Sequence, residues 1–128
     1  MMRRAALCLG LSLLAGCVVV PTIPHGIGAV VDRKTRNSFQ PGTSTRADVL
    51  LALGDPPYRF QDDRFFMYAW DVAYGYVGVA YAGGAPLRAF HYLCLEFGPD
   101  GVLVRRKEIV NDWDKAISAC MNPEAKDT

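Results

Sequence analysis

The hydrophobic and polar positions of this chain follow three successive patterns. Residues 5–31 contain no Asp, Glu, Lys or Arg. A helical period follows within residues 41–54, and alternation with a period of two dominates from residue 64 onward. These patterns indicate an uncharged N-terminal segment, then an amphipathic helix, and then strands.

Residues 41–54 predict a helix with both of its ends marked. Thr45 can serve as the N-cap, Asp48 three residues later completes a capping-box pair, and Gly54 supplies the C-terminal stop. A shorter helix is expected within residues 27–36. The apolar face of the longer helix is formed by Val49, Leu50 and Leu53.

Three later runs predict strands. They are residues 64–71, 88–97 and 102–107. In the first, a period of two points Phe66, Tyr68 and Trp70 to one face and Phe65, Met67 and Ala69 to the other. In the second, Leu93, Leu95 and Phe97 alternate with Tyr92, Cys94 and Glu96. Pro99-Asp100-Gly101 joins the last two runs and suits a tight hairpin turn. The Tyr/Gly/Ala-rich residues 74–86, between the first two runs, are compatible with extended hairpin arms or with a mobile loop. The runs therefore predict a three-stranded antiparallel sheet.

The C-terminal part predicts a last helix. Residues 111–114, Asn-Asp-Trp-Asp, are typical of a helix N-terminus. Trp113, Ile117 and Cys120 then share one helical face. The elements together predict an α+β fold, a two-layer sandwich. In it, a short N-terminal helix or helices pack on the three-stranded antiparallel sheet, with an additional short C-terminal helix.

The N-terminal residues resemble the export signal of a bacterial lipoprotein. Two arginines precede the apolar stretch 5–14, which is too short to cross a hydrocarbon core of about 30 Å comfortably. Leu14-Ala15-Gly16-Cys17 is similar to the lipobox, in which cleavage precedes the cysteine. That cysteine receives diacylglycerol on its thiol and an acyl chain on its new amine. The alternative is an uncleaved signal anchor with an incidental cysteine.

The lipobox resemblance divides the chain into four parts. We expect a signal peptide over residues 1–16, the lipidated Cys17 and a tether over 17–38, the folded domain with its C-terminal helix over 39–121, and a tail over 122–128. Several acyl chains give durable membrane anchoring. Val18 fits sorting to the outer membrane, since an Asp at that position retains lipoproteins of enteric bacteria in the inner membrane. The expected location is the outer membrane, lipid-anchored and facing the periplasm.

Composition and charge narrow the functional classes. The 128 residues are 51% hydrophobic and 21% charged, with a formal charge of +1, which excludes a disordered tail or a polybasic arm. Cleavage before Cys17 removes two of the 14 basic residues and none of the 13 acidic ones. The mature domain is then slightly acidic and its basic residues are scattered, so no nucleic-acid partner is expected.

A set of short motifs extends through the predicted domain. They are Pro41-Gly42-Thr43-Ser44-Thr45, Asp48-Val49, Leu53-Gly54-Asp55-Pro56-Pro57, the aromatic strand with Tyr68, and Leu93-x-Leu95-x-Phe97-Gly98-Pro99-Asp100-Gly101-Val102. This combination, over roughly residues 39–107, resembles the SmpA/OmlA domain family of BamE-like outer-membrane lipoproteins. The resemblance implies a non-catalytic accessory of outer-membrane β-barrel assembly or envelope integrity. Its implied partners are envelope proteins, with the β-barrel assembly complex among them.

The four cysteines have separate expected fates. Cys8 leaves with the signal peptide and Cys17 carries lipid. Cys94 and Cys120 remain in an oxidising compartment, where a disulfide can clip the last helix to the sheet. Closing a loop of about 25 residues stabilises a domain by ~3 kcal/mol on the chain-entropy model. Because Cys94 points away from the face of its leucine neighbours, the helix would have to reach that opposite face; two buried thiols are the alternative.

Catalysis and metal binding are not expected. His25 and His91 occur in unrelated contexts, and His91 and Cys94 point to opposite faces of a strand. The serines lack a Gly-x-Ser-x-Gly context, and no glycine-rich loop suits a phosphate. We therefore expect no enzyme, no metal site, no small-molecule substrate and no cofactor besides the covalent lipid on Cys17.

The tyrosines of the glycine-rich stretch are the candidate partner-binding residues. Tyr74, Tyr76 and Tyr81 combine large contact area with a low entropic cost of ordering. The alternative is a hairpin whose rings pack on their own domain. Two functional hypotheses follow: a lipid-anchored interaction module, or an inhibitor or ligand-binding domain on the same scaffold that uses residues 74–86.

Overall fold

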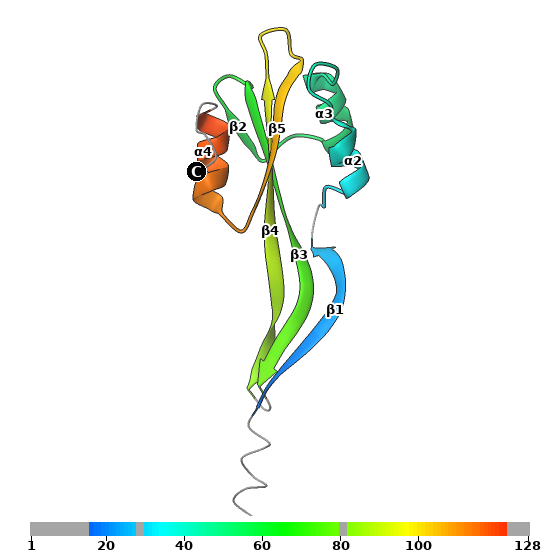
Figure 1. Ribbon diagram of the computed structural model, residues 1–128, viewed down its shortest axis with the longest axis vertical. Helices are drawn as coiled ribbons and strands as arrows, with labels where there is room; N and C mark the ends of the chain where they lie inside the picture. Colours follow the sequence, from blue (N-terminus) through cyan, green and yellow to red (C-terminus); the bar gives the residue numbers. More distant parts are fainter. Residues whose placement is uncertain (1–15, 28–29, 80–81, 123–128) are drawn as a thin grey trace, which may run out of the picture. The chain divides into compact units, whose positions relative to one another are not determined.

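The computed structural model describes residues 16–27, 30–79 and 82–122. These residues form five strands and three short helices (Figure 1). In chain order the elements are β1 (Cys17–Ile27), α2 (Arg33–Ser38), α3 (Arg46–Leu53), β2 (Tyr58–Phe60), β3 (Phe65–Val79), β4 (Gly83–Phe97), β5 (Leu103–Val110) and α4 (Trp113–Met121).

The strands form one sheet in the order β1-β3-β4-β5, and β2 pairs with β3 off this path. The β4–β5 pair is antiparallel, with Leu95 opposite Arg106. Its turn closes at Gly101, whose φ of 78° lies in the left-handed region that glycine adopts without strain. The backbone N–H of Gly98 donates to the carbonyl of Val102 at 2.9 Å across this turn. The predicted hairpin is therefore confirmed.

Contacts divide the described residues into two compact units. The first, which we call the hairpin unit, contains residues 16–25, 73–79 and 82–88. The second, which we call the core unit, contains the described residues of 26–72 and of 89–122. Strands β3 and β4 each have residues in both units. Different parts of the same strand therefore have different surroundings.

Helix α3 begins and ends as its sequence predicts. The Thr45 hydroxyl accepts from the backbone N–H of Asp48, and the Asp48 carboxylate accepts from the backbone N–H of Thr45 at 2.8 Å. This hydrogen bonding to the charged form lowers the pKa of Asp48 below its usual value. At the other end, the N–H of Gly54 donates to the carbonyl of Leu50 at 2.9 Å. The caps therefore fix the helix between the predicted residues.

Helix α3 covers one face of the sheet in the core unit. Alternate residues of β3 point to this face, and the fully buried Val49 is the contribution of α3. The aromatic rings of Phe66 and Phe97 meet edge to face, with 5.0 Å between centroids. The buried residues of this cluster are Val31, Phe39, Val49, Phe66, Tyr68, Trp70, Leu93, Leu95, Phe97 and Leu103.

Helix α4 covers the opposite face of the same sheet (Figure 1). The intervening residues of β3 point there, and α4 contributes small side chains that allow close approach to the sheet. Asp112 caps the helix, accepting from the N–H of Lys115 at 2.9 Å. The buried residues of this second cluster are Phe65, Met67, Cys94, Ile109, Ala116, Ala119 and Cys120.

The predicted two-layer sandwich on three strands is wrong. The described residues form a five-stranded, mostly sheet structure with helices on both faces of the core unit. Residues 17–27, expected within a tether, form strand β1, whose Val18-Val19-Val20 run is β-branched and suits a strand. Of the two alternatives for residues 74–86, extended hairpin arms are confirmed for the described residues, because 74–79 belong to β3 and 83–86 to β4. The last helix adds a third layer because Phe65 and Met67 present a second apolar face.

Candidate functional site

Cys17 is the first residue of β1 and is exposed. Among the described residues it is the one cysteine with a free thiol. Strand β1 runs alongside β3, and a Cβ atom on Gly75 would lie 3.0 Å from the carbonyl oxygen of Val20. Within the hairpin unit, the first residues of β1 therefore lie beside β3 (Figure 1). Residues 1–15 of the predicted signal peptide lie outside the described part of the chain.

Two of the three candidate tyrosines lie on one side of β3. Tyr74 and Tyr76 are 46% and 44% exposed, whereas Ala73 and Gly75 are buried. Their rings are therefore available for contact and do not form part of either buried cluster. Tyr81, the third candidate, lies outside the described residues. A binding role for these tyrosines stays a prediction.

The predicted disulfide is present. Cys94 of β4 and Cys120 of α4 are bonded, with 5.7 Å between their Cα atoms, and both are buried. The sequence required the last helix to reach the sheet face to which Cys94 points. It does so, because α4 lies on the face opposite the one to which Leu93 and Leu95 point. The disulfide therefore joins the second layer of helix directly to the central sheet.

A hollow lined by aromatic rings lies on the α4 side of the core unit. We call it the aromatic hollow; its volume is about 330 Å³. Trp113 meets Tyr58 at 5.3 Å and Tyr92 at 5.5 Å between ring centroids, both edge to face. Such edge-to-face pairs hold the rings in defined orientations. The lining residues are Tyr58, Ala69, Trp70, Asp71, Phe90, Tyr92 and Trp113.

The chain fixes Trp113 from both ends of its helix. Asn111 has a φ of 57°, a left-handed conformation that asparagine tolerates, and its backbone N–H donates to the carbonyl of Phe90 at 2.8 Å. The Asn111 side-chain oxygen accepts from the N–H of Phe90, also at 2.8 Å. Asp112 then caps α4, and Cys120 is bonded to the sheet. These restraints hold the indole in a defined position.

The aromatic hollow is suited to contact with apolar or aromatic groups. Tyr58, Phe90 and Trp113 are 39%, 47% and 42% exposed. Exposed Trp and Tyr rings around a concave surface are characteristic of the few residues that contribute most to protein–protein affinity. Asp71 is the one carboxylate among the lining residues, which include no histidine, cysteine or serine. The hollow therefore offers aromatic surface and one carboxylate for contact.

Sequence reasoning missed the aromatic hollow, although a signal for it exists. Phe90 and Tyr92 share a strand face with Cys94, because side chains two and four residues apart point the same way. Once Cys94 is bonded to Cys120, helix α4 must cover that face. Trp113 lies seven residues before Cys120, about 10 Å along a helix. The predicted disulfide thus placed the tryptophan near the strand aromatics.

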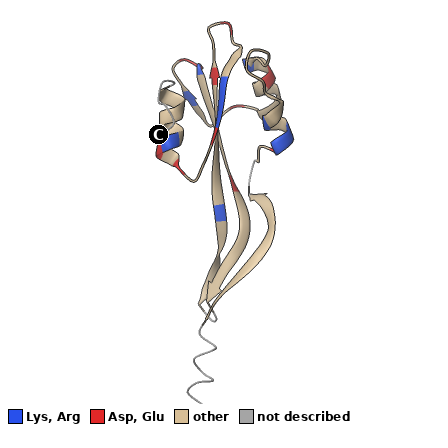
Figure 2. Cartoon of the chain, in the orientation of Figure 1, with Lys and Arg blue, Asp and Glu red and all other residues tan. Residues whose placement is uncertain are grey.

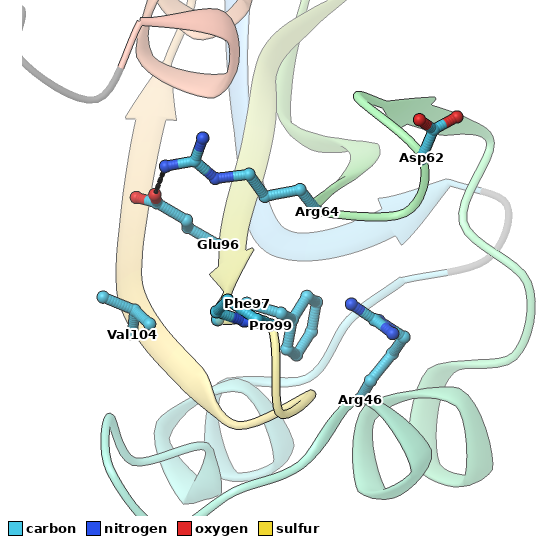
Figure 3. A pocket seen from close by; sticks show the side chains of 8 residues that line it. Arg46, Asp62, Arg64, Glu96, Phe97, Pro99 and Val104 are labelled. Atoms are coloured by element: carbon cyan, nitrogen blue, oxygen red, sulfur yellow. Dashed lines mark hydrogen bonds and ion pairs between the residues drawn. The ribbon is translucent and has the colours of Figure 1, made fainter.

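A second hollow of about 630 Å³ is lined by charged side chains of the core unit (Figure 3). The Glu96 carboxylate, nearly buried, accepts from Arg64 at 2.8 Å and from Arg105 at 3.0 Å. Arg105 also donates to the carbonyl of Ala119 at 2.7 Å. Arg46 comes from α3 and lies over the ring of Phe97, 5.4 Å from its centroid. The Glu96 charge is thus used internally, to join β4 to β5 and to the turn before β3.

The two histidines lie in different units of the described chain. The His91 ring stacks on Trp70 with 5.4 Å between centroids, and its Nδ1 lies 3.2 Å from a Glu108 oxygen. His25 contacts the carbonyl of Ile23 in the hairpin unit. Within residues 16–27, 30–79 and 82–122, no group of three or more His, Cys, Asp or Glu side chains is arranged to hold a metal ion.

Searches against protein-family models, curated proteins and solved structures find no match to this chain. No helix among the described residues is long and apolar enough to span a membrane.

Proposed function

We propose that this chain is a lipoprotein of the outer membrane, anchored through Cys17 and facing the periplasm, where it acts as a non-catalytic interaction module. The sequence Leu14-Ala15-Gly16-Cys17 carries the proposal. The exposed, free thiol of Cys17 is compatible with acylation, and the Cys94–Cys120 disulfide is compatible with an oxidising compartment. The covalent lipid on Cys17 is then the group that anchors the chain.

The aromatic hollow is the surface that we assign to the protein partner. Its rings come from β2, β3, β4 and α4, and the helix is held by a cap and a disulfide. A rigid, concave aromatic surface suits an apolar side chain of an envelope protein. The resemblance to the SmpA/OmlA family suggests a subunit of the β-barrel assembly complex as that partner. The proposed role is therefore an accessory of barrel assembly or envelope integrity.

Lipidation is tested by labelling cells with a palmitate analogue. The wild-type chain should be labelled and should stay with the membrane fraction, whereas Cys17→Ser should lose both properties. A labelled Cys17→Ser chain would contradict the assignment of the lipidation site. An unlabelled wild-type chain would contradict the lipoprotein proposal itself.

The partner is tested by affinity purification from gently solubilised membranes. Barrel-assembly subunits should copurify with the wild-type chain and be lost with Trp113→Ala, because this change removes the central ring of the aromatic hollow. Val104→Ala is a matched control, since Val104 is also exposed but lies outside this hollow. Purification without barrel-assembly subunits would reject the specific partner. Their undiminished recovery with Trp113→Ala would reject the aromatic hollow as the contact.

A second candidate function is a lipid-anchored inhibitor or ligand-binding domain that uses residues 74–86. The exposure of Tyr74 and Tyr76 on one side of β3 favours it. In that case Tyr74→Ala with Tyr76→Ala should abolish partner capture while Trp113→Ala leaves it intact. The opposite pattern favours the aromatic hollow, so the two variants decide between the two functions.

A further inference from the structure

We propose that the distal end of the hairpin unit docks non-covalently into the interfacial region of the bilayer that holds the Cys17 anchor. We define this distal end as residues 17–20, 77–79 and 82–85. The inference rests on the proposed lipidation of Cys17 and adds a second contact with lipid. The lipid bilayer, and not a partner protein, is what covers this apolar surface.

The distal end exposes apolar side chains at the residues next to the anchor. Four valines are among the exposed large hydrophobic residues, three of them directly after Cys17. Acyl chains attached to Cys17 would hold these side chains within reach of the bilayer, and transfer of apolar surface out of water is favourable. The valines are Val18, Val19, Val20 and Val79.

The hairpin unit lacks the charges that would oppose such docking. Among its described residues Arg88 is the one Asp, Glu, Lys or Arg, and it lies in the sixth position of β4, outside the distal end (Figure 2). Burying an isolated charge at a lipid interface costs free energy, whereas the distal end has no charged side chain to desolvate. The docking should accordingly depend on apolar contact and not on anionic lipid.

The backbone limits how deeply the unit can enter. Strand β1 is at the edge of the sheet, and β4 pairs with β5 only from His91 onward. Edge strands present unpaired N–H and C=O groups, which cannot be satisfied inside the hydrocarbon core. The distal end therefore docks at the level of the headgroups and the adjoining acyl segments. Tyr74 and Tyr76 suit this level, since tyrosine is enriched at membrane–water interfaces.

The cysteine chemistry of the chain allows a direct measurement of depth. In the mature chain Cys8 has left with the signal peptide, Cys17 is acylated and Cys94 is bonded to Cys120, so an introduced cysteine is the one reactive thiol. Val19→Cys and Val79→Cys place a fluorophore at the distal end. Val104→Cys and Val110→Cys, on β5 of the core unit, are controls because their exposures of 57% and 45% match the 60% and 43% of Val19 and Val79.

The mature lipidated chain carrying each label is reconstituted into phosphatidylcholine vesicles whose acyl chains are brominated. Quenching should be several-fold stronger at positions 19 and 79 than at 104 and 110, and high salt should not reduce it. Equal quenching at all four positions overturns the docking proposal while leaving lipidation of Cys17 intact. Quenching at 19 and 79 that appears only with phosphatidylglycerol and disappears in salt also overturns it, because the attraction is then electrostatic.

The outcome stays decisive if Cys17 carries no lipid. The proposed function then fails, and the four labelled variants are repeated with Cys8→Ser and Cys17→Ser, so that the introduced cysteine is again the one reactive thiol. This protein is added to preformed vesicles. Stronger quenching at 19 and 79 than at 104 and 110 supports docking by the hairpin unit alone. Quenching that is absent or equal at all four positions overturns it. Two positions at the distal end guard against the misfolding of one variant.

Discussion

The hairpin unit and the core unit use the same two strands in different surroundings. In the core unit β3 presents Phe66, Tyr68 and Trp70 to a face covered by α3, and all three are buried. In the hairpin unit the same alternation continues as Tyr74 and Tyr76, which are exposed. An alternating aromatic pattern predicts a strand, but what covers the strand decides whether its rings become core or surface.

The largest expected contrast is between two aromatic residues of β3. Phe66→Ala should lower the free energy of unfolding by about 3–5 kcal/mol, because it leaves a cavity beside Phe97 in the buried cluster. Tyr76→Ala should cost less than about 1 kcal/mol, since its ring is 44% exposed. Urea unfolding followed by tryptophan fluorescence measures both. A large loss of stability with Tyr76→Ala would show that the ring is buried, and the contrast between the units would fail.

The disulfide should stabilise the core unit and not the hairpin unit. Replacing Cys94 and Cys120 together with alanine should cost ~3 kcal/mol on the chain-entropy model, because the bridge closes a long loop. Amide hydrogen exchange should accelerate in α4 while residues 73–79 are unchanged. Reduction of the wild-type chain should reproduce the double variant. Equal acceleration in both units would mean that they unfold as one cooperative body.

A pair of glycines tests the hairpin unit by itself. A Cβ on Gly84 would lie 2.8 Å from the carbonyl oxygen of Val77, whereas the nearest atom to a Cβ on Gly78 is at 3.7 Å. Gly84→Ala should therefore cost about 1–3 kcal/mol of local stability through overpacking, while Gly78→Ala should be nearly neutral. Faster amide exchange in residues 73–79 with Gly84→Ala alone would confirm this. The melting of the core unit should be the same in both variants.

The sequence predicted the elements whose signals are local. The capping box of Thr45 and Asp48, the stop at Gly54 and the turn at Gly101 are short-range features, and the corresponding helix and hairpin are present. The disulfide between Cys94 and Cys120 also followed, since few cysteines were available to pair. These features depend on residues close in sequence or on a small number of possible pairings.

The prediction was wrong where the answer depended on distant pairing. Val18-Val19-Val20 was attributed to a tether beside the lipid anchor, yet it pairs with β3, some fifty residues later in the chain. To predict the aromatic hollow, one would have to place Trp113 against Phe90 and Tyr58. These residues come from three separate segments, and no local sequence period connects them. Strand partners and interlayer contacts depend on tertiary packing, so propensity alone does not determine them.

The smallest expected effect is the loss of stability when the hydroxyl of a buried tyrosine is removed, compared with that of an exposed one. The Tyr68 hydroxyl donates to the carbonyl of Gly54 at 2.8 Å, and burial raises the pKa of Tyr68 from 10.0 to about 12. Because the folded pKa lies above the unfolded value, this contribution to stability is complete below pH 10 and is lost as the pH rises towards 12. Tyr68→Phe should cost about 1 kcal/mol at neutral pH, and its stability should decline less steeply at alkaline pH.

Tyr76→Phe is the matched control for Tyr68→Phe, because it removes a hydroxyl from the same strand where the ring is exposed. Chemical unfolding at a series of pH values should show a reduced alkaline decline for Tyr68→Phe only. If the stability of Tyr68→Phe falls at alkaline pH as steeply as that of the wild-type chain, groups other than Tyr68 cause the fall. An equal change in both variants would mean that burial of the Tyr68 ring is not the cause of the reduced decline.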